Sequence, residues 1–341
     1  MIVISFSFIK RPACGLALLA LLVAGCTQLE EIFAPSAPSV SDNWSSVLNE
    51  IRAFERRIGF RDTGNFARFS AGDEPNSSCG YVSHFHLPYS YEDPAILWRD
   101  AVSEQECLEF AADGDVSFGI IEALGEVNAP MTPSIIASGL DRFLYLVIHE
   151  DCHDQFALPY GIEEAVCDLV TYKAMPVLSA ERFGWATRAH RAVRRYVQSE
   201  SRRAHATIAF YGQLAALYSR YHLREVAADA VLLDRAQIFA GAERALGRDA
   251  GSMNNVAIAN DMTYSRHYPL LERAFDALGR DLARSVAFFK HVDQVKPSRA
   301  AVMEKHRIAD EKSVEFIRAY EAAVVDTIEK ALAEQKAPRQ R

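Results

Sequence analysis

Residues 149–153, which read His-Glu-Asp-Cys-His, have the types and the spacing to bind a metal ion and use it in hydrolysis. Residues four apart lie on one face of a helix, so His149 and His153 can reach the same ion, with Glu150 beside it facing a water. A metal polarises water, and a neighbouring carboxylate takes the proton before the oxygen attacks a carbonyl carbon. The spacing predicts a metal-dependent hydrolytic site with Glu150 as general base.

The segment in front of this motif is apolar. Residues 143–148, Phe-Leu-Tyr-Leu-Val-Ile, are hydrophobic on nearly every helical face, which is typical of a buried helix. Polar side chains at the end of such a helix are costly unless they have partners. A bound metal would supply these partners.

A third ligand is expected soon after His153, and residues 161–171, Gly-Ile-Glu-Glu-Ala-Val-Cys-Asp-Leu-Val-Thr, offer acidic candidates. This stretch resembles the glutamate helix of the thermolysin-type gluzincins, which are zinc metallopeptidases. The resemblance implies that Glu164 is the third zinc ligand. It also implies that Asp168 orients a zinc-bound histidine, His149, through its other ring N–H. Glu163 is the alternative ligand, and a solvated acidic helix start is the competing interpretation.

The connection between the two metal segments is short, because only ten residues separate His153 from Glu164. This is similar to the predicted bacterial lipoprotein aminopeptidases, which have an Asn-Asn-Ala motif and a later Tyr. In this chain residues 253–257 read Met-Asn-Asn-Val-Ala, and Tyr264 follows. The likeness covers about residues 115–295 and implies that Asn254 and Asn255 bind substrate. Helix capping or a turn is the alternative for both asparagines.

A hydrolase also needs a hydrogen-bond donor that stabilises the oxyanion opposite the metal. Tyr264 is the first candidate and His267 the second, because both follow the Asn-Asn segment and neither lies in a plain apolar stripe. An ordinary packed side chain is the alternative for each of them.

Four cysteines lie beyond the N-terminal segment. Cys152 is inside the metal motif and Cys167 follows Glu164 by three residues, so two adjacent helices would allow a Cys152–Cys167 disulfide. The remaining pair would then be Cys79–Cys107. The alternative is that Cys152 is a free thiol or an additional metal ligand.

The first 26 residues predict a lipoprotein signal peptide. Lys10 and Arg11 precede an apolar run, and residues 22–26, Leu-Val-Ala-Gly-Cys, resemble the bacterial lipobox, which implies cleavage after residue 25 and lipidation of Cys26. The residue after the cysteine is Thr rather than Asp, which implies the outer membrane, facing the periplasm. An ordinary signal peptide or an uncleaved anchor is the alternative. Cleavage would change the net charge from −8 to −10, since residues 1–25 carry two bases and no acid.

The rest of the chain divides into three expected parts: a spacer at 26–43, a zincin-like metallopeptidase domain at 44–295 and a C-terminal helical extension at 296–341. Apolar spacing predicts a helix over 44–60 and strands over 81–87 and 116–121. It also predicts helices over 135–156 and 162–175, further long helices from there to about residue 247, and helices again from 267 onward. The expected fold is α+β, mostly α, with a small β front followed by a helical body.

The predicted function is a lipid-anchored, zinc-dependent peptidase of the gluzincin type, acting on peptides or proteins with one zinc ion per chain. The aminopeptidase assignment is implied by the resemblance alone. The alternatives are a non-catalytic envelope lipoprotein with a structural or regulatory zinc, and a helical partner-binding scaffold. Lys and Arg are scattered in an acidic chain, so nucleic acid is not an expected partner.

Overall fold

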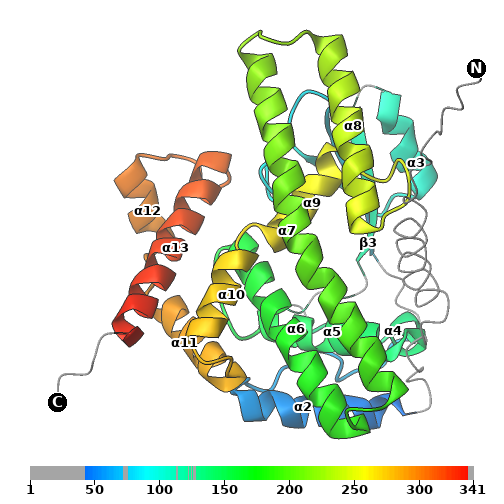
Figure 1. Cartoon of the computed structure of the whole chain (residues 1–341), viewed down its shortest axis with the longest axis vertical. Coiled ribbons are helices and arrows are strands. Elements are labelled where there is room, and N and C mark those ends of the chain that lie inside the picture. The colour runs from blue at the N-terminus through cyan, green and yellow to red at the C-terminus, as the bar shows by residue number, and fades with distance from the viewer. Residues whose placement is uncertain are drawn as a thin grey trace, which may run out of the picture.

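Helices make up most of the molecule, with a small sheet in the N-terminal third (Figure 1). The computed structural model describes residues 43–71, 76–112, 114–121, 123, 125 and 128–336. The α+β, mostly α class predicted from the sequence is thereby confirmed. The expected signal peptide, the lipidation site Cys26 and the spacer up to residue 42 lie outside the described residues. Among the helices described, none is long and apolar enough to cross a bilayer.

The first described helix, α2 (Trp44–Ile58), follows the predicted 44–60 segment closely. One face is buried, and its apolar residues are Val47, Leu48, Ile51, Phe54 and Ile58. The helix ends at Gly59, whose φ of 95° lies in the left-handed region that favours glycine. The buried face packs against α5 and α11, which places α2 below the metal helices.

The sheet has three antiparallel strands in the order β2-β1-β3: β1 (Asn76–Ser83), β2 (Leu97–Asp100) and β3 (Gly114–Ile121). β3 is an edge strand of this sheet, paired to β1 from Asn76↔Ile121 to Ser83↔Gly114. The predicted disulfide Cys79–Cys107 is confirmed, and it joins β1 to the short helix α3 (Glu104–Glu109). A 3₁₀ turn, η1 (Phe110–Ala112), leads into β3.

Two buried helices carry the metal motif. α5 (Leu140–His153) and α6 (Tyr160–Phe183) pack side by side, and the main hydrophobic core surrounds them. Phe143, Val147 and Ile148 of α5 are fully buried, as expected from the apolar lead-in. The loop between the helices contains Pro159, after which α6 begins. Packing on this scale fixes the positions of α5 and α6 relative to each other.

The remaining helices cover α6 and the sheet. α7 (Arg188–His222) and α8 (Ala228–Leu246) form a long hairpin that projects at the top of Figure 1, and α9 (Asn255–Ser265) lies between this hairpin and β3. α10 (Tyr268–Ala277), α11 (Leu282–Val295), α12 (Arg299–His306) and α13 (Val314–Lys336) complete the chain. Val324 and Ile328 of α13 are fully buried in the main core.

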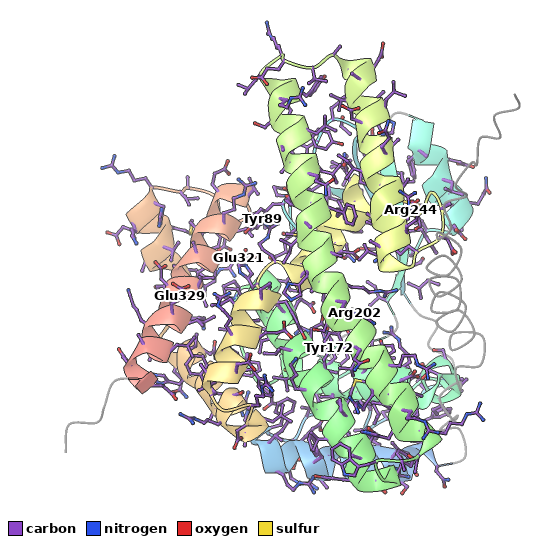
Figure 2. All side chains as sticks on the ribbon, in the orientation of Figure 1. Tyr89, Tyr172, Arg202, Arg244, Glu321 and Glu329 are labelled. Carbon is purple, nitrogen blue, oxygen red and sulfur yellow. A yellow bond between two sulfur atoms is a disulfide. The ribbon has the colours of Figure 1, made fainter. Side chains whose placement is uncertain are left out.

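The buried carboxylate of Glu321 on α13 contacts the segment before β2 and the first turn of α6. Glu321 accepts a hydrogen bond from the Tyr89 hydroxyl at 2.6 Å, and both residues are labelled in Figure 2. Oε2 of Glu321 also lies 2.9 Å from Nε2 of His267. A Cβ added to Gly161, in the first turn of α6, would lie 2.5 Å from Oε1 of Glu321. A larger residue at position 161 would therefore require the Glu321 carboxylate to move.

Two predicted elements were wrong in their bounds. The strand expected at 81–87 ends at Ser83, because a turn follows and the backbone N–H of His86 bonds to the carbonyl of Ser83. The helix expected at 135–156 is two helices, α4 (Pro133–Ala137) and α5, because Ser138 and Gly139 are extended. The sequence patterns did not predict β2 or α3.

Candidate metal centre

Three side chains from α5 and α6 converge at one point. Nε2 of His149 lies 3.3 Å from Nε2 of His153. Oε2 of Glu164 lies 3.1 Å from the first nitrogen and 3.4 Å from the second. All three residues are buried, and together they could hold a metal ion. Four-residue spacing on α5 and the side-by-side packing of α6 produce this cluster.

The spacing of the three donor atoms fits a tetrahedral metal ion. Zinc binds histidine nitrogen at about 2.0–2.1 Å and carboxylate oxygen at about 2.0–2.2 Å, which places tetrahedral ligand atoms about 3.3 Å apart. The three observed separations lie around this value. Two imidazole nitrogens and one carboxylate oxygen also suit a divalent transition metal. The residues present therefore fit the group that the motif predicts.

A second carboxylate faces the outer nitrogen of each histidine. Nδ1 of His149 lies 3.3 Å from Oδ1 of Asp168, which also accepts a hydrogen bond from the Tyr145 hydroxyl at 2.8 Å. Nδ1 of His153 lies 3.0 Å from Oε1 of Glu163. Carboxylates in these positions fix the ring orientation and leave Nε2 to bind a metal. Asp168 lies on the side of the His149 ring that the resemblance implied, although Nδ1 makes no hydrogen bond, so its orienting role stays a prediction.

Glu163 therefore does not have the alternative role of metal ligand. Its Oε1 contacts the far side of the His153 ring, and its Oε2 accepts a hydrogen bond from the backbone N–H of Leu158 at 2.8 Å. Successive residues on a helix point about 100° apart, so Glu163 and Glu164 cannot both face the same point. Glu164 faces the two Nε2 atoms, whereas Glu163 contacts Nδ1 on the opposite side of the His153 ring.

We expect Glu163→Gln to lower metal affinity about 10- to 100-fold, because residues that orient metal-ligating histidines contribute to affinity on this scale. The amide keeps the size of the side chain and removes its charge opposite the His153 ring. Competition with a chelating dye would measure the dissociation constant. Glu181→Gln, on an exposed carboxylate of the same helix, is the control. An unchanged affinity in Glu163→Gln would show that Glu163 does not support His153.

In the metal-free cluster, the electrostatics favour protonated His149 and His153 and an ionised Glu164. Burial opposes the charge on His149, but the carboxylates of Asp168 and Glu164 outweigh burial and raise its pKa to about 10. Burial likewise opposes the charge on His153, and Glu163 and Glu164 raise that pKa to about 12. Burial alone would raise the pKa of Glu164, but the two histidines lower it well below its usual range. A metal ion must therefore displace protons from the rings to bind.

The predicted general base, Glu150, sits beside the three ligands with one oxygen held by the backbone. Its Oε2 accepts a hydrogen bond from the N–H of Gly125 at 2.8 Å. A Cβ at Gly125 would lie 2.2 Å from the carbonyl oxygen of Glu150, so only glycine fits this close contact. Burial raises the pKa of Glu150, while the neighbouring histidines act in the opposite direction. A carboxylate with a raised pKa is suited to accept and return a proton.

The cluster lies in a cavity of about 570 Å³ with one wall made by β3. Tyr264, the first candidate for oxyanion donor, lines this cavity, and its ring centroid is 6.3 Å from that of His149. Tyr160 lines it too, together with Glu164. His267, the second candidate, instead pairs with Glu321. Of the two candidates, only Tyr264 is placed beside the cluster.

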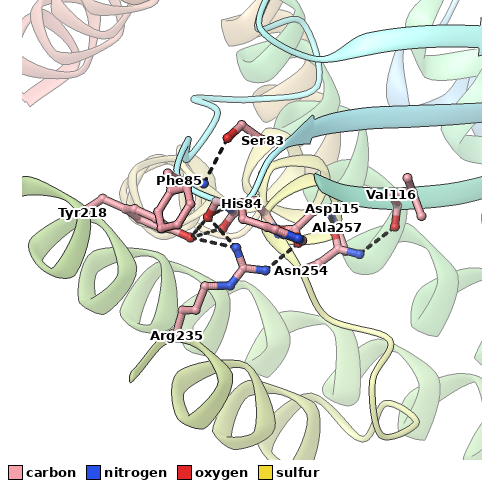
Figure 3. Close-up of polar contacts among 10 residues, drawn as sticks. Ser83, His84, Phe85, Asp115, Val116, Tyr218, Arg235, Asn254 and Ala257 are labelled. Carbon is pink, nitrogen blue, oxygen red and sulfur yellow. Dashed lines mark hydrogen bonds and ion pairs between the residues drawn. The ribbon is translucent and has the colours of Figure 1, made fainter. Parts of the chain in front are cut away.

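The side chains of Asn254 and Asn255 make hydrogen bonds within the fold and do not line the metal cavity, which favours the alternative interpretation over substrate binding. Asn254 caps α9, accepting from the N–H of Ala257 at 3.0 Å and donating to the carbonyl of Val116 on β3 at 2.7 Å (Figure 3). Asn255 is fully buried, and its side chain bonds to the Tyr218 hydroxyl and the His84 carbonyl. Asn254 is a helix cap, as the alternative interpretation proposed. Asn255 joins α9 to Tyr218 on α7 and to the backbone at His84.

The network in Figure 3 centres on buried Asp115 of β3. Its Oδ1 pairs with Nη2 of Arg235 at 2.5 Å and lies 2.8 Å from Nδ1 of His84. Its Oδ2 accepts from the backbone N–H of Asn255 at 2.9 Å. A buried ion pair is costly unless its remaining hydrogen-bonding capacity is used, as it is here. The network fixes β3 against α8 and α9 and so sets the wall of the metal cavity.

The predicted Cys152–Cys167 disulfide was wrong. Both residues are buried free thiols. Burial raises the pKa of the Cys167 thiol well above its usual range, so it stays protonated. Buried thiols pack as small apolar groups, which is their role between α5 and α6.

Three residues at the site were missed from the sequence. Tyr145 lies four residues before His149 and Tyr160 four before Glu164, so helical spacing could have placed both beside the ligands. Tyr145 stacks on the His149 ring with centroids 5.0 Å apart. Gly125 gives no such signal, because its contact with Glu150 depends on how a distant loop packs.

No protein-family profile, curated protein or solved structure matches this chain. Its function is therefore inferred from the chemistry of its own residues.

Proposed function

We propose that the protein is a zinc-dependent peptidase of the gluzincin type, with a zincin-like core, that hydrolyses peptide bonds. The observation that carries the proposal is the triangle of Nε2 of His149, Nε2 of His153 and Oε2 of Glu164, with the Glu150 carboxylate beside it in a cavity. Two histidines four apart on one helix and a glutamate on the next match the resemblance in the two metal segments.

The number of ligands favours a catalytic ion over a structural one. Structural zinc sites usually have four protein ligands, often cysteines, whereas catalytic sites have three. Among the residues that the structure describes, the cluster has three members. Cys152, the candidate for a fourth, is not among them and is buried in the hydrophobic core. This supports the peptidase over an envelope protein with a structural zinc.

The residues around the cluster supply the remaining chemistry. Zinc, when bound, would act as a Lewis acid and lower the pKa of water. Glu150 would take the proton of the attacking water and return it to the leaving amine. Burial raises the pKa of Tyr264 well above its usual range, so its hydroxyl stays protonated and could donate to the oxyanion.

The edge strand β3 offers a place for the substrate. Residues 117–121 of β3 line the cavity, and β3 has β1 on one side in the sheet. An extended peptide can add to an exposed strand edge through main-chain hydrogen bonds, with side chains entering pockets beside it. The arrangement supports a peptide or protein substrate laid across the cluster.

The expected lipid on Cys26 would hold this peptidase at the periplasmic face of the outer membrane. Membrane contact would come from the lipid, since a domain with a net charge of −10 has no basic excess to attract an anionic surface. Substrates would then be peptides or proteins of the bacterial envelope.

Metal removal tests the proposal. We expect the purified full chain to contain one zinc ion, to cleave members of a quenched-fluorescent peptide library, to lose cleavage with a chelator and to regain it with zinc. Zinc affinity should rise with pH, because fewer protons then compete for the His149 and His153 rings, whose pKa values are raised to about 10 and 12. Elemental analysis, cleavage rates and calorimetry supply the measurements. A zinc-loaded protein that cleaves no peptide would contradict the peptidase and favour the structural-zinc alternative.

A further inference from the structure

Glu150 lies in the last turn of α5, where backbone carbonyls generally lack a partner within the helix. A buried asparagine from the segment after α2 supplies a partner there. Nδ2 of Asn65 donates to the carbonyl oxygen of Glu150 at 3.2 Å and to Oδ2 of Asp154 at 3.0 Å. Asn65 is fully buried, and none of the steps proposed above uses it. The main chain of the proposed general base is therefore held from outside its own helix.

The same side chain also contacts the segment that binds the Glu150 carboxylate. Oδ1 of Asn65 accepts a hydrogen bond from the backbone N–H of Ala129 at 3.0 Å. Ala129 follows Gly125 by four residues, and the N–H of Gly125 donates to Oε2 of Glu150 at 2.8 Å. The N–H of Asn128 in turn donates to the carbonyl of Gly125 at 3.3 Å, which joins these two residues directly. One amide thus links the backbone of Glu150 to the segment that holds its side chain.

Two further contacts keep the segments of Asn65 and Ala129 together. The backbone N–H of Phe66 donates to the carbonyl of Ala129 at 2.6 Å. A Cβ added to Gly64 would lie 1.9 Å from Oδ1 of Asn128, so the two segments are also in direct contact on the other side of Asn65. The position of the Asn65 amide is therefore fixed by its neighbours in the chain.

The type of side chain matters here because an amide both donates and accepts hydrogen bonds. The Glu150 carbonyl and the Ala129 N–H are satisfied together only when Nδ2 faces the first and Oδ1 faces the second. Aspartate at position 65 would turn a carboxylate oxygen toward another acceptor, and alanine would leave both groups without this partner. Leaving a buried polar group without its partner costs more than the hydrogen bond itself contributes. Asparagine meets both requirements with one side chain.

We propose that Asn65 is a positioning residue that holds Glu150 where its carboxylate can take a proton from water. The inference rests on the proposed peptidase function, in which Glu150 is the general base. A base must lie within hydrogen-bond reach of the proton that it takes, and a misplacement of about 1 Å can cost about 10²-fold in rate. Asn65 is not among the residues that line the metal cavity or form the metal cluster. It therefore acts on the chemical step and not on zinc or substrate binding.

Kinetics of Asn65 variants test the proposal on a peptide that the wild type cleaves. Asn65→Ala should lower kcat about 10- to 100-fold, while KM and the zinc content stay as in the wild type. Asn65→Asp keeps an acceptor for Ala129 but cannot donate to Glu150, so it should lower kcat as well. An unchanged kcat in folded, zinc-loaded Asn65→Ala would overturn the inference.

Thr187→Ala is the matched control, because it also removes a side chain that donates to a backbone carbonyl and accepts from a backbone N–H. Thr187 caps α7 beyond the C-terminal end of α6, whereas the metal ligand Glu164 lies in the second turn of that helix. We expect this variant to lose stability and to keep the kcat of the wild type. An equal loss of kcat in Thr187→Ala and Asn65→Ala would contradict a specific role for Asn65.

A double variant separates the positioning of Glu150 from a general loss of structure. Glu150→Gln has no base to position, so adding Asn65→Ala to it should lower kcat further by less than about twofold. Single-turnover cleavage by the zinc-loaded proteins would measure this. A general loss of structure would instead lower kcat by the same factor with and without Glu150, and that result would overturn the inference.

Hydrogen exchange tests the contact without any cleavage. NMR of the zinc-loaded full chain labelled with ¹⁵N-glycine would follow the N–H of Gly125. We expect it to exchange about 10- to 100-fold faster in Asn65→Ala, with the N–H of Gly241 in the middle of α8 unchanged. If this result is found and the wild type cleaves no peptide, the link from Asn65 to Glu150 stands and only the peptidase proposal fails. Unchanged exchange at Gly125 would overturn the inference.

Discussion

Glu150→Gln should lower kcat about 10²- to 10⁴-fold while bound zinc stays at one ion per chain, since general acid–base catalysis contributes on this scale. Glu150 is not among the three convergent ligand atoms, so its loss leaves the metal cluster intact. The amide can still accept the hydrogen bond from Gly125, which preserves the local packing. What is removed is the ability to take a proton from water.

The measurement needs both zinc content and single-turnover cleavage, so that loss of metal is not mistaken for loss of the base. Glu304→Gln, on an exposed glutamate of α12, is the matched control and should behave as the wild type. Thermal unfolding should show Glu150→Gln at least as stable, because burial raises the pKa of Glu150 and a neutral amide avoids the cost of burying a charge. Full activity in this variant would rule out Glu150 as the general base.

His153→Ala should abolish zinc binding and activity together. The variant removes one of three ligands and leaves the buried carboxylates of Glu163 and Glu164 without the ring that faces both of them. Breaking a buried ion pair by removing one partner costs about 3–5 kcal/mol, so the metal-free variant should also be less stable than the metal-free wild type. Adding zinc should raise the melting temperature of the wild type and leave that of the variant unchanged.

Equilibrium dialysis and thermal unfolding would measure both effects. His222→Ala, at the exposed end of α7, is the control and should bind zinc normally. If His153→Ala retained zinc with wild-type affinity, the ion would be held elsewhere and the proposed centre would be wrong.

The part of the site that lies on single helices was predictable from the sequence. His149 and His153 share a face because they are four apart, and Glu164 and Asp168 repeat that spacing on the next helix. Local sequence could not show which of Glu163 and Glu164 faces the metal, because that depends on how α6 is rotated against α5. Both glutamates are buried and both touch His153, one on each ring nitrogen. Only tertiary packing assigns one to the metal and the other to the outer face of the ring.

Other errors have the same cause. Asn254 and Asn255 resemble a family motif, but their partners, Val116 and His84, come from segments more than a hundred residues earlier. The strand expected at 81–87 ended early because a turn forms at Ser83, although the alternation of apolar residues continues. The sequence could not single out Gly125 as a site residue. Glycine is required there because the backbone of Glu150, from a distant segment, packs directly against it. Local spacing predicts the elements, and contacts between distant segments decide their roles.

The contact of Glu321 with Tyr89 and with the start of α6 bears on the order in which the chain can mature. Tyr89 and Glu321 are 232 positions apart, and Glu321 also closes against Gly161, two residues before Glu163. During synthesis Glu321 is added 160 positions after Gly161, so the first turn of α6 lacks this support until α13 has been made. The ligands on that turn would then reach their final positions late, and the nascent chain would be a poor metal binder until α13 is in place.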